Sequence, residues 1–135
     1  MVKTKKTILI VIDEADSTLK MAQKIVFALS DCNVLMRNAS QFNPTELLGA
    51  DVCFFGCEKP KPVSFAALEQ VLLHINLAGR PCGLFSQGQE NAISYLKTII
   101  KDSEISLVTE PCRSDKANDI KTWTNTVIEA SKKKK

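Results

Sequence analysis

Short runs of apolar residues alternate along this chain with segments in which apolar residues recur every three or four positions. The runs are mostly unbroken, as in strands that are covered on both faces of a sheet. The second run is interrupted by Arg37 and Asn38, which predicts that its strand lies at the edge of the sheet. The five predicted strands are residues 7–12, 33–37, 51–55, 81–85 and 105–109.

The segments between the runs predict helices. In the short segment NPTELL, Asn43 can cap a helix, Pro44 takes the first helical position, and Glu46 follows the cap by three residues, which makes a capping box. Five strands and five helices in strict alternation predict an α/β fold, with a parallel sheet wrapped on both faces and right-handed crossovers. Four further helices are indicated by Leu19, Ala22, Val26 and Leu29; Phe65, Leu68, Leu72 and Ile75; Ile93, Leu96 and Ile100; and Ile120, Trp123 and Val127.

Open parallel sheets bind ligands beyond the carboxyl ends of their strands, where the strand order reverses. For a sheet of order 2-1-3-4-5, that point lies between the first and third strands. The candidate site is therefore built from residues 13–18, 56–64 and 86–91.

The length of 135 residues is that of one ordinary domain, which we expect to cover residues 1–131 and to be followed by a lysine tail at 132–135. The longest early apolar run, residues 8–12, is too short for a secretory signal or a membrane span. We therefore expect a cytoplasmic protein.

The net charge of +3 comes from the ends of the chain. Seven lysines lie at residues 3–6 and 132–135, which leaves 11 basic against 15 acidic residues between them, a net charge of −4. A nucleic-acid binder concentrates basic groups on its folded surface, so no specific nucleic-acid partner is expected. The lysine tail is interpreted as a solvated end of the chain.

The five cysteines include no C-x-x-C pair, and His74 has no acidic or thiol partner nearby in the sequence. Zinc and thioredoxin-type chemistry therefore lose support, and no metal site is expected. The cysteines are interpreted as small apolar residues, with Cys57, at the exit of a strand, the one candidate for reactivity. No nucleophile elbow or Walker loop occurs.

Two longer segments resemble the flavodoxin family. NPTELLGADVCFFGC (43–57) is similar to the family's short second helix and third strand, and LAGRPCGLFS (77–86) to the lead into its fourth strand. Thr18, Ala22 and Ile25 match positions of its first helix, and the likeness extends over residues 7–130. It implies a flavodoxin-like three-layer α/β/α sandwich with strand order 2-1-3-4-5. It also implies flavin mononucleotide (FMN) as cofactor, electron transfer to a redox partner, and a carrier rather than an enzyme.

The family's phosphate loop, S/T-x-T-G-x-T, combines small residues and hydroxyls at a helix N-terminus, so that N–H and O–H groups converge on the phosphate. In that register this chain has Asp13, Ala15 and Asp16, and only Thr18 matches; Ser17 adds a nearby hydroxyl. A carboxylate at about 4 Å from a phosphate repels it by roughly 4 kcal/mol near a protein surface. The structural interpretation is that Asp16 caps the first helix without any ligand.

The flavin ring site departs from the family as well, because CEKPKPVS (57–64) and SQGQEN (86–91) contain no aromatic residue. Phe65 and Tyr95 fall at helical positions, where we expect them to pack in the core. Lys59 and Lys61 would attract an anion to the second loop or stand solvated beside their prolines. If FMN binds, the residues expected to hold it are Asp13, Glu14, Ala15, Asp16, Ser17, Thr18, Gly56, Cys57, Glu58, Lys59, Ser86, Gln87 and Gly88.

The same order of strands also fits a response-regulator receiver domain. TILIVIDEAD (7–16) is similar to its first strand and acidic pair, Lys59 and Pro60 to its turn after strand three, and Ser86 to its switch hydroxyl. Phosphoryl transfer there needs an acceptor Asp and a Lys, but this chain has Gly56 and Glu110 at those positions. A receiver relative would be a pseudo-receiver without phosphorylation.

Two functional hypotheses follow. The first is an FMN-dependent electron carrier whose flavin site is degraded and binds weakly. The alternative is a cofactor-free interaction module, derived from a flavodoxin or a pseudo-receiver. Either would act on an unidentified redox or regulatory protein partner, and the sequence does not specify the oligomeric state.

Overall fold

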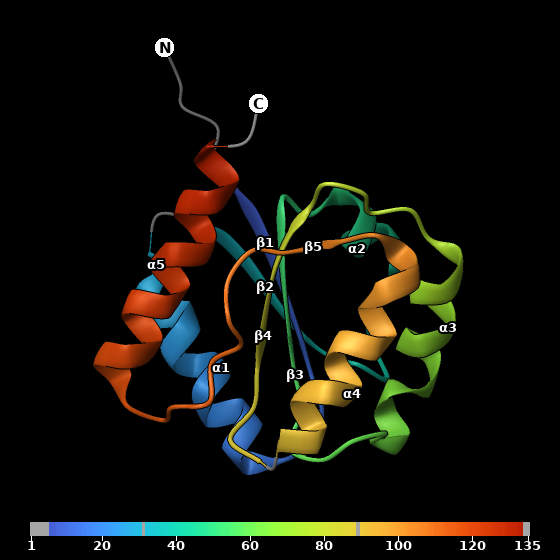
Figure 1. Cartoon of the computed structure of the whole chain (residues 1–135), viewed down its shortest axis with the longest axis horizontal. Coiled ribbons are helices and arrows are strands. Elements are labelled where there is room, and N and C mark those ends of the chain that lie inside the picture. The colour runs from blue at the N-terminus through green and yellow to red at the C-terminus, as the bar shows by residue number, and fades with distance from the viewer. Residues whose placement is uncertain (1–5, 31, 89, 134–135) are drawn as a thin grey trace.

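One five-stranded parallel sheet lies between two layers of helices in the computed structural model, which describes residues 6–30, 32–88 and 90–133 (Figure 1). The strands stand in the order β2-β1-β3-β4-β5, as predicted. The elements are β1 (Thr7–Ile12), α1 (Asp16–Ala28), β2 (Asn33–Asn38), α2 (Pro44–Gly49), β3 (Val52–Gly56), a short helical turn η1 (Val63–Phe65), α3 (Ala66–His74), β4 (Pro81–Phe85), α4 (Glu90–Ile100), a second turn η2 (Lys101–Ser103), β5 (Ser106–Leu107) and α5 (Ala117–Lys133).

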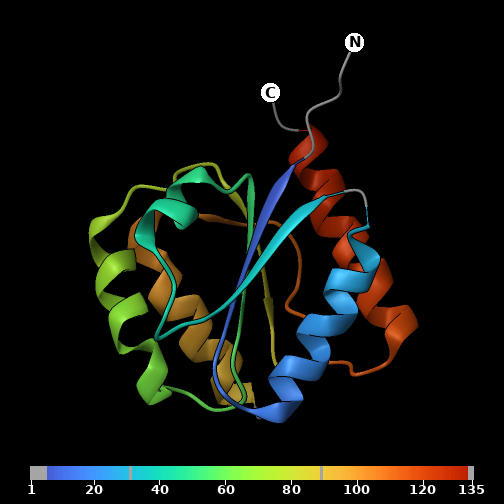
Figure 2. The same cartoon turned by 180° about the vertical axis from the view of Figure 1, so that it is seen from behind.

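The two faces of the sheet carry separate cores because successive side chains of a strand point to opposite faces. Ile8 and Ile10 of β1 pack with α1 and α5, whereas Leu9 and Val11 pack with α2, α3 and α4. Figure 1 shows α1 and α5 to the left of the sheet and α3 and α4 to its right, and Figure 2 shows the same layers with the two sides exchanged. All of β3 and β4 is buried, which explains their unbroken apolar runs.

The capping box of α2 forms as predicted. The side chain of Asn43 accepts a hydrogen bond from the Thr45 N–H at 3.0 Å. At the other end of the helix, Arg80 donates to the carbonyl of Ala50 at 2.6 Å. These bonds satisfy backbone groups that a helix of six residues leaves without partners.

The edge position of β2 is confirmed, and Arg37 is explained by a partner. Its guanidinium forms an ion pair with Glu46 at 3.1 Å. This side-chain hydrogen bond lowers the pKa of Glu46. The charged residue that interrupts the apolar run therefore joins the edge strand to α2.

Strand β5 is shorter than predicted, with two residues where 105–109 was expected. The pairing with β4 lapses at 109–111 and resumes at Cys112, whose N–H donates to the carbonyl of Leu84 at 2.9 Å. Pro111 lies in this gap and has no N–H to donate. The apolar composition of the segment did not indicate the interruption.

The inward face of α1 differs from the predicted one. Leu19 is 38% exposed and Val26 is half-buried, while Met21 and Ile25 are buried together with Ala22. The helix carries apolar residues on more than one side, so their spacing alone did not determine which side faces the sheet. Helix α5 runs through Lys133, into the predicted tail; residues 134–135 lie outside the described part of the chain.

Four of the five free thiols are buried. Burial raises the pKa of Cys53 to about 12, and burial together with the nearby Asp13 carboxylate raises the pKa of Cys57 to about 12. A thiol that stays protonated at neutral pH is a poor nucleophile. Cys32 is the half-buried exception.

Glycine is required at position 83 of β4 by a close contact with α5. A Cβ atom there would lie 2.9 Å from the ring of Trp123. This ring is fixed, since its N–H donates to the carbonyl of Glu110 at 2.8 Å and its edge contacts Phe54, with 5.4 Å between ring centroids.

We therefore expect Gly83→Ala to lower the free energy of unfolding by about 1–3 kcal/mol, because a rigid ring must shift. The matched control is Gly49→Ala, where an added Cβ meets nothing within 4 Å and the helix gains propensity. Denaturant unfolding of both variants provides the measurement. Equal stabilities of the two would contradict the packing of Trp123 on Gly83.

We expect Cys32 to react with iodoacetamide at pH 8 before any of the four buried thiols, which should react only as the protein unfolds. Mass spectrometry of the alkylated peptides checks the order. Alkylation of Cys57 as fast as that of Cys32 would contradict the burial of Cys57.

The raised pKa of Cys57 also implies a contribution to the free energy of unfolding that is complete below pH 9.0 and is lost as the pH rises toward 12, because the unfolded chain ionises first.

Candidate functional site

The loops that follow β1, β3 and β4 meet at one end of the sheet, the lower edge in Figure 1. Their contact is made by Asp13, the first residue after β1, whose side chain is only 6% exposed. Its Oδ1 accepts a hydrogen bond from the N–H of Ala15 at 3.3 Å, and its Oδ2 accepts from the N–H of Glu58 at 3.0 Å. One carboxylate thus joins the loop after β1 to the loop after β3.

A second contact joins the same two loops. The hydroxyl of Ser17, in the first turn of α1, donates to Oε2 of Glu58 at 3.0 Å. Glu58 therefore contacts the first loop through both its backbone N–H and its carboxylate. The hydroxyl predicted to hold a phosphate is bonded to an acid of the protein itself.

Helix α1 begins without a side-chain cap. Its N-cap residue is Ala15, in an extended conformation, and Asp16 is the first helical residue. The prediction that Asp16 caps the helix is wrong, because no side chain caps this helix. The acid that accepts a hydrogen bond within the loop is Asp13, three residues before Asp16. A carboxylate that accepts a hydrogen bond from the N–H two residues further along forms a common local turn. Asp16 and Glu14 are exposed.

Thr18 matches the family pattern in sequence, but its side chain is fully buried. It shares the inward face of α1 with Met21 and Ile25, and its hydroxyl has no hydrogen-bond partner among the described residues. The hydroxyl therefore lies under the helix, against the sheet, rather than at the surface of the loop.

The third loop closes against the second. The hydroxyl of Ser86 accepts a hydrogen bond from the N–H of Gly88 at 3.0 Å. A Cβ atom on Gly88 would lie 1.8 Å from the carbonyl oxygen of Glu58, so only glycine permits this approach. Gln87 is exposed, and Gln89, which belongs to the predicted segment 86–91, lies outside the described residues.

The remaining predicted residues divide into buried and exposed. Gly56 lies under the ring of Phe85, whose nearest atom would be 2.3 Å from an added Cβ, and Cys57 is buried beside it. Lys59 and Lys61 are exposed, and Lys61 has a left-handed backbone with φ 52°. The two buried residues cannot line an open ring site with their side chains.

A hollow of about 430 Å³ lies between the second and third loops. Its lining includes Glu58, Lys59, Pro60, Gly88 and Asn91, and no aromatic side chain. It offers one acid and one base to a ligand, but no ring for stacking.

A doubly charged phosphate would compete with the protein's own acids at the first loop. The N–H of Ala15 already donates to Asp13, and the carboxylates of Asp13 and Glu58 both lie at this end of α1. An incoming phosphate would lose the donor and meet repulsion from both acids. The residues form a hydrogen-bonded junction between the loops after β1 and β3.

The sequence did not reveal the role of Asp13 as a bridge, because its partner is 45 residues away. The available signal was an acid directly after a buried strand, at a position where the family has a hydroxyl. Glu58 was included among the predicted site residues without a role, and the structure brings it to the first loop.

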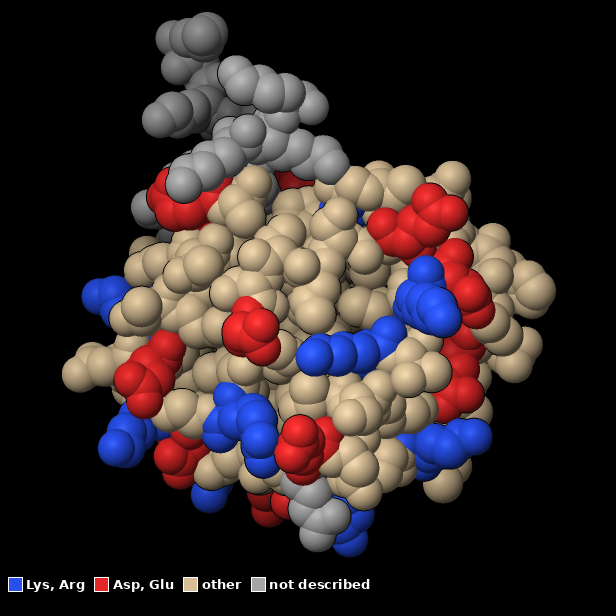
Figure 3. All heavy atoms as spheres, in the orientation of Figure 1, with Lys and Arg blue, Asp and Glu red and all other residues tan. Residues whose placement is uncertain are grey.

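Metal ligation and membrane insertion find no support in the described part of the molecule. No group of three or more His, Cys, Asp or Glu side chains that could hold a metal ion occurs within residues 6–30, 32–88 and 90–133. Among the helices described, none has the length and apolar character needed to cross a membrane. On the face drawn in Figure 3, acidic and basic side chains are interspersed rather than gathered by sign.

The sequence matches no family model and no curated protein. Solved structures of similar shape include a short-chain flavodoxin associated with a non-canonical PDU bacterial microcompartment, with a TM-score of 0.82 and 10% identity over 95% of this chain and 99% of the other. Flavodoxin 2 from Bacillus cereus, in its oxidised form, has a TM-score of 0.80 and 19% identity over 91% and 98% of the two chains. A flavodoxin from Streptococcus pneumonia TIGR4 has a TM-score of 0.77 and 15% identity over 95% and 99%. The chain therefore has the flavodoxin fold over almost its whole length.

Proposed function

We propose that this flavodoxin-like protein acts by binding a protein partner and does not hold FMN tightly. The observation that carries the proposal is the carboxylate of Asp13, which accepts from the Ala15 N–H of the first loop and from the Glu58 N–H of the second. A cytoplasmic binding protein, rather than an enzyme, fits a site in which these side chains are engaged with one another.

Binding of a phosphate at the first loop would exchange one anion for another. To admit a phosphate, the loop must release the bonds from Ala15 and Glu58 to Asp13, and a hydrogen bond to a charged group contributes about 1.5–3 kcal/mol. The released carboxylate would remain near the phosphate and repel it by roughly 4 kcal/mol at about 4 Å. The N–H groups in the first turn of α1, which no side chain caps, are the donors left to offset these costs.

The flavin ring would find no stacking partner in the loops. Phe65 is fully buried, and the Tyr95 hydroxyl donates to Glu69 at 2.5 Å. The two rings lie 6.1 Å apart, centroid to centroid, within the layer of α3 and α4. Both aromatic residues therefore serve packing, in agreement with their helical positions.

The second candidate function is an electron carrier that binds FMN weakly. It is favoured by the hollow beside Lys59, which leaves room near the loops expected to hold the flavin ring. It is also favoured by the solved structures of similar fold, which are flavodoxins. An origin as a pseudo-receiver is a variant of the first proposal. In that case Gly56 and Glu110 stand where a receiver domain has its phosphate-accepting Asp and its Lys.

We expect the purified protein to be colourless and FMN to bind with a Kd above about 100 µM, which corresponds to less than about 5.5 kcal/mol. Fluorescence quenching of FMN during titration with the protein measures this value. A yellow preparation, or a Kd below about 1 µM, would overturn the first proposal in favour of the carrier.

Replacing Asp13 by Ser removes the carboxylate that fills the loop. We expect this variant to bind FMN about tenfold or more tightly and to lose about 1–3 kcal/mol of stability, because the two loops are no longer joined. Asp16→Ser is the matched control, since its carboxylate is exposed and makes no bond within the loop. An equal gain in FMN affinity for both variants would show that general charge, and not occupation of the donors, sets the affinity.

A further inference from the structure

Phe27, in the last turn of α1, is 90% exposed. It lies outside both cores of the sheet, so packing within the chain does not explain a large aromatic side chain at this position. Single exposed apolar residues are common on proteins, but this one stands between two hollows.

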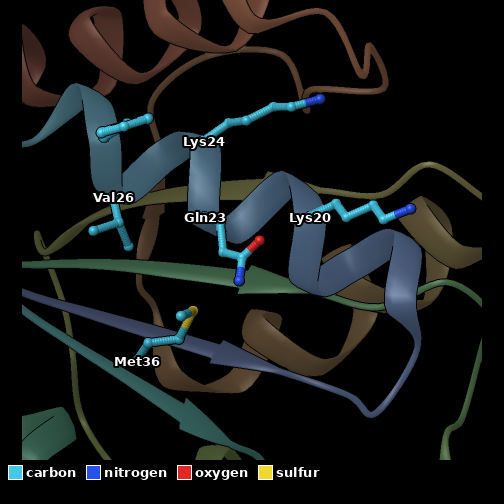
Figure 4. Close-up of a pocket in the computed structure, with 6 residues that line it drawn as sticks. Lys20, Gln23, Lys24, Val26 and Met36 are labelled. Carbon is cyan, nitrogen blue, oxygen red and sulfur yellow. The ribbon is translucent and has the colours of Figure 1, made fainter.

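The larger hollow, of about 540 Å³, lies between α1 and the edge strand β2. Figure 4 shows Gln23 and Val26 directed from the helix toward the strand and Met36 directed from the strand toward the helix. Its lining is Lys20, Gln23, Lys24, Val26, Phe27 and Met36. The apolar side chains of this lining are Val26, Phe27 and Met36.

The second hollow, of about 300 Å³, lies between α1 and α5 and shares Phe27 and Lys24 with the first. Lys121 lies on its far side, on α5. The two hollows and Phe27 together form one surface across β2, α1 and α5, which we call the Phe27 surface.

The charge of the Phe27 surface is opposite to that of the folded body. Lys20, Lys24 and Lys121 line it, and none of the described residues that line it is Asp or Glu, although residues 8–131 carry a net charge of −4. Lys24 donates to the backbone carbonyl of Asp115 at 2.6 Å, so the side chain is held in place without a carboxylate. Neither Lys20 nor Lys24 has an ion-pair partner among the described residues.

The positive charge of these lysines limits which molecules can occupy the Phe27 surface. A second copy of the chain, related by a twofold axis, would bring the same lysines together, and like charges oppose such a contact. The lysine-rich ends of this chain are excluded by the same repulsion. A lipid surface would meet these lysines and the exposed ring of Phe27, but it would leave the two hollows beside that ring unfilled.

We propose that the Phe27 surface binds an acidic segment of a partner protein. An apolar side chain of the segment enters the hollow beside Phe27, and carboxylates of the segment meet Lys20 and Lys24. Residues of α1, α5 and the edge strand β2 form this surface. Its role rests on the proposed function, because both require a protein partner.

Peptides of random sequence test which ligand chemistry the surface selects. A phage-displayed library of such peptides of about 16 residues, enough for roughly 24 Å of helix, is selected on the immobilised protein. We expect the enriched peptides to combine Asp or Glu with a large apolar residue. No enrichment, or enrichment of basic peptides, overturns the proposal.

The position of binding is tested with one enriched peptide by fluorescence anisotropy. Phe27→Ser and the pair Lys20→Glu with Lys24→Glu should each weaken its Kd by about tenfold or more. Val63→Ser is the matched control, because Val63 is 93% exposed but lies between β3 and α3, and its Kd should change less than about twofold. Equal effects of Phe27→Ser and Val63→Ser overturn the proposal.

Two measurements separate the other occupants. A dimer in sedimentation that Phe27→Ser dissociates, or binding to phosphatidylglycerol vesicles that the same change abolishes, would replace the acidic partner and overturn the proposal. FMN titration of the Phe27→Ser protein should match the parent protein. Tight FMN binding together with acidic-peptide binding would refute the proposed function alone, and weak FMN binding without peptide binding would refute the Phe27 surface alone.

Discussion

The buried carboxylate of Asp13 is the interaction on which the functional end of this molecule depends. A buried acid is costly unless hydrogen bonds satisfy it, and here the N–H groups of Ala15 and Glu58 do so. The same bonds fix the first loop against the second, and the contact of Gly88 with Glu58 adds the third. Two N–H groups that could receive an outside anion are thereby used within the chain.

The fold explains why these loops meet, and the side chains decide what they do there. Strand order β2-β1-β3-β4-β5 brings the ends of β1 and β3 together, so residues 45 positions apart become neighbours. Many flavodoxin-fold sites use this meeting point for a ligand. In this chain, acids and a bonded hydroxyl stand there instead, and the exposed features that invite a contact lie on α1, at Phe27 and its lysines.

Much of the fold could be read from the sequence, because long-range burial leaves a local pattern. Fully buried strands such as β3 and β4 appear as unbroken apolar runs, and the capping box of α2 lies within four residues. Features that depend on distant partners were not readable. The inward face of α1, the break in β5 at Pro111 and the bond from the Glu58 N–H to Asp13 are each decided by what the rest of the chain places opposite.

The two amides that bond to Asp13 offer the most direct test of its role. In an NMR spectrum that resolves backbone N–H groups, excess FMN should leave the signals of Ala15 and Glu58 unshifted, because both donors remain on the protein's own carboxylate. Large shifts of these two amides on addition of FMN, with loss of their bonds to Asp13, would show that the loop yields to a phosphate and would contradict that role.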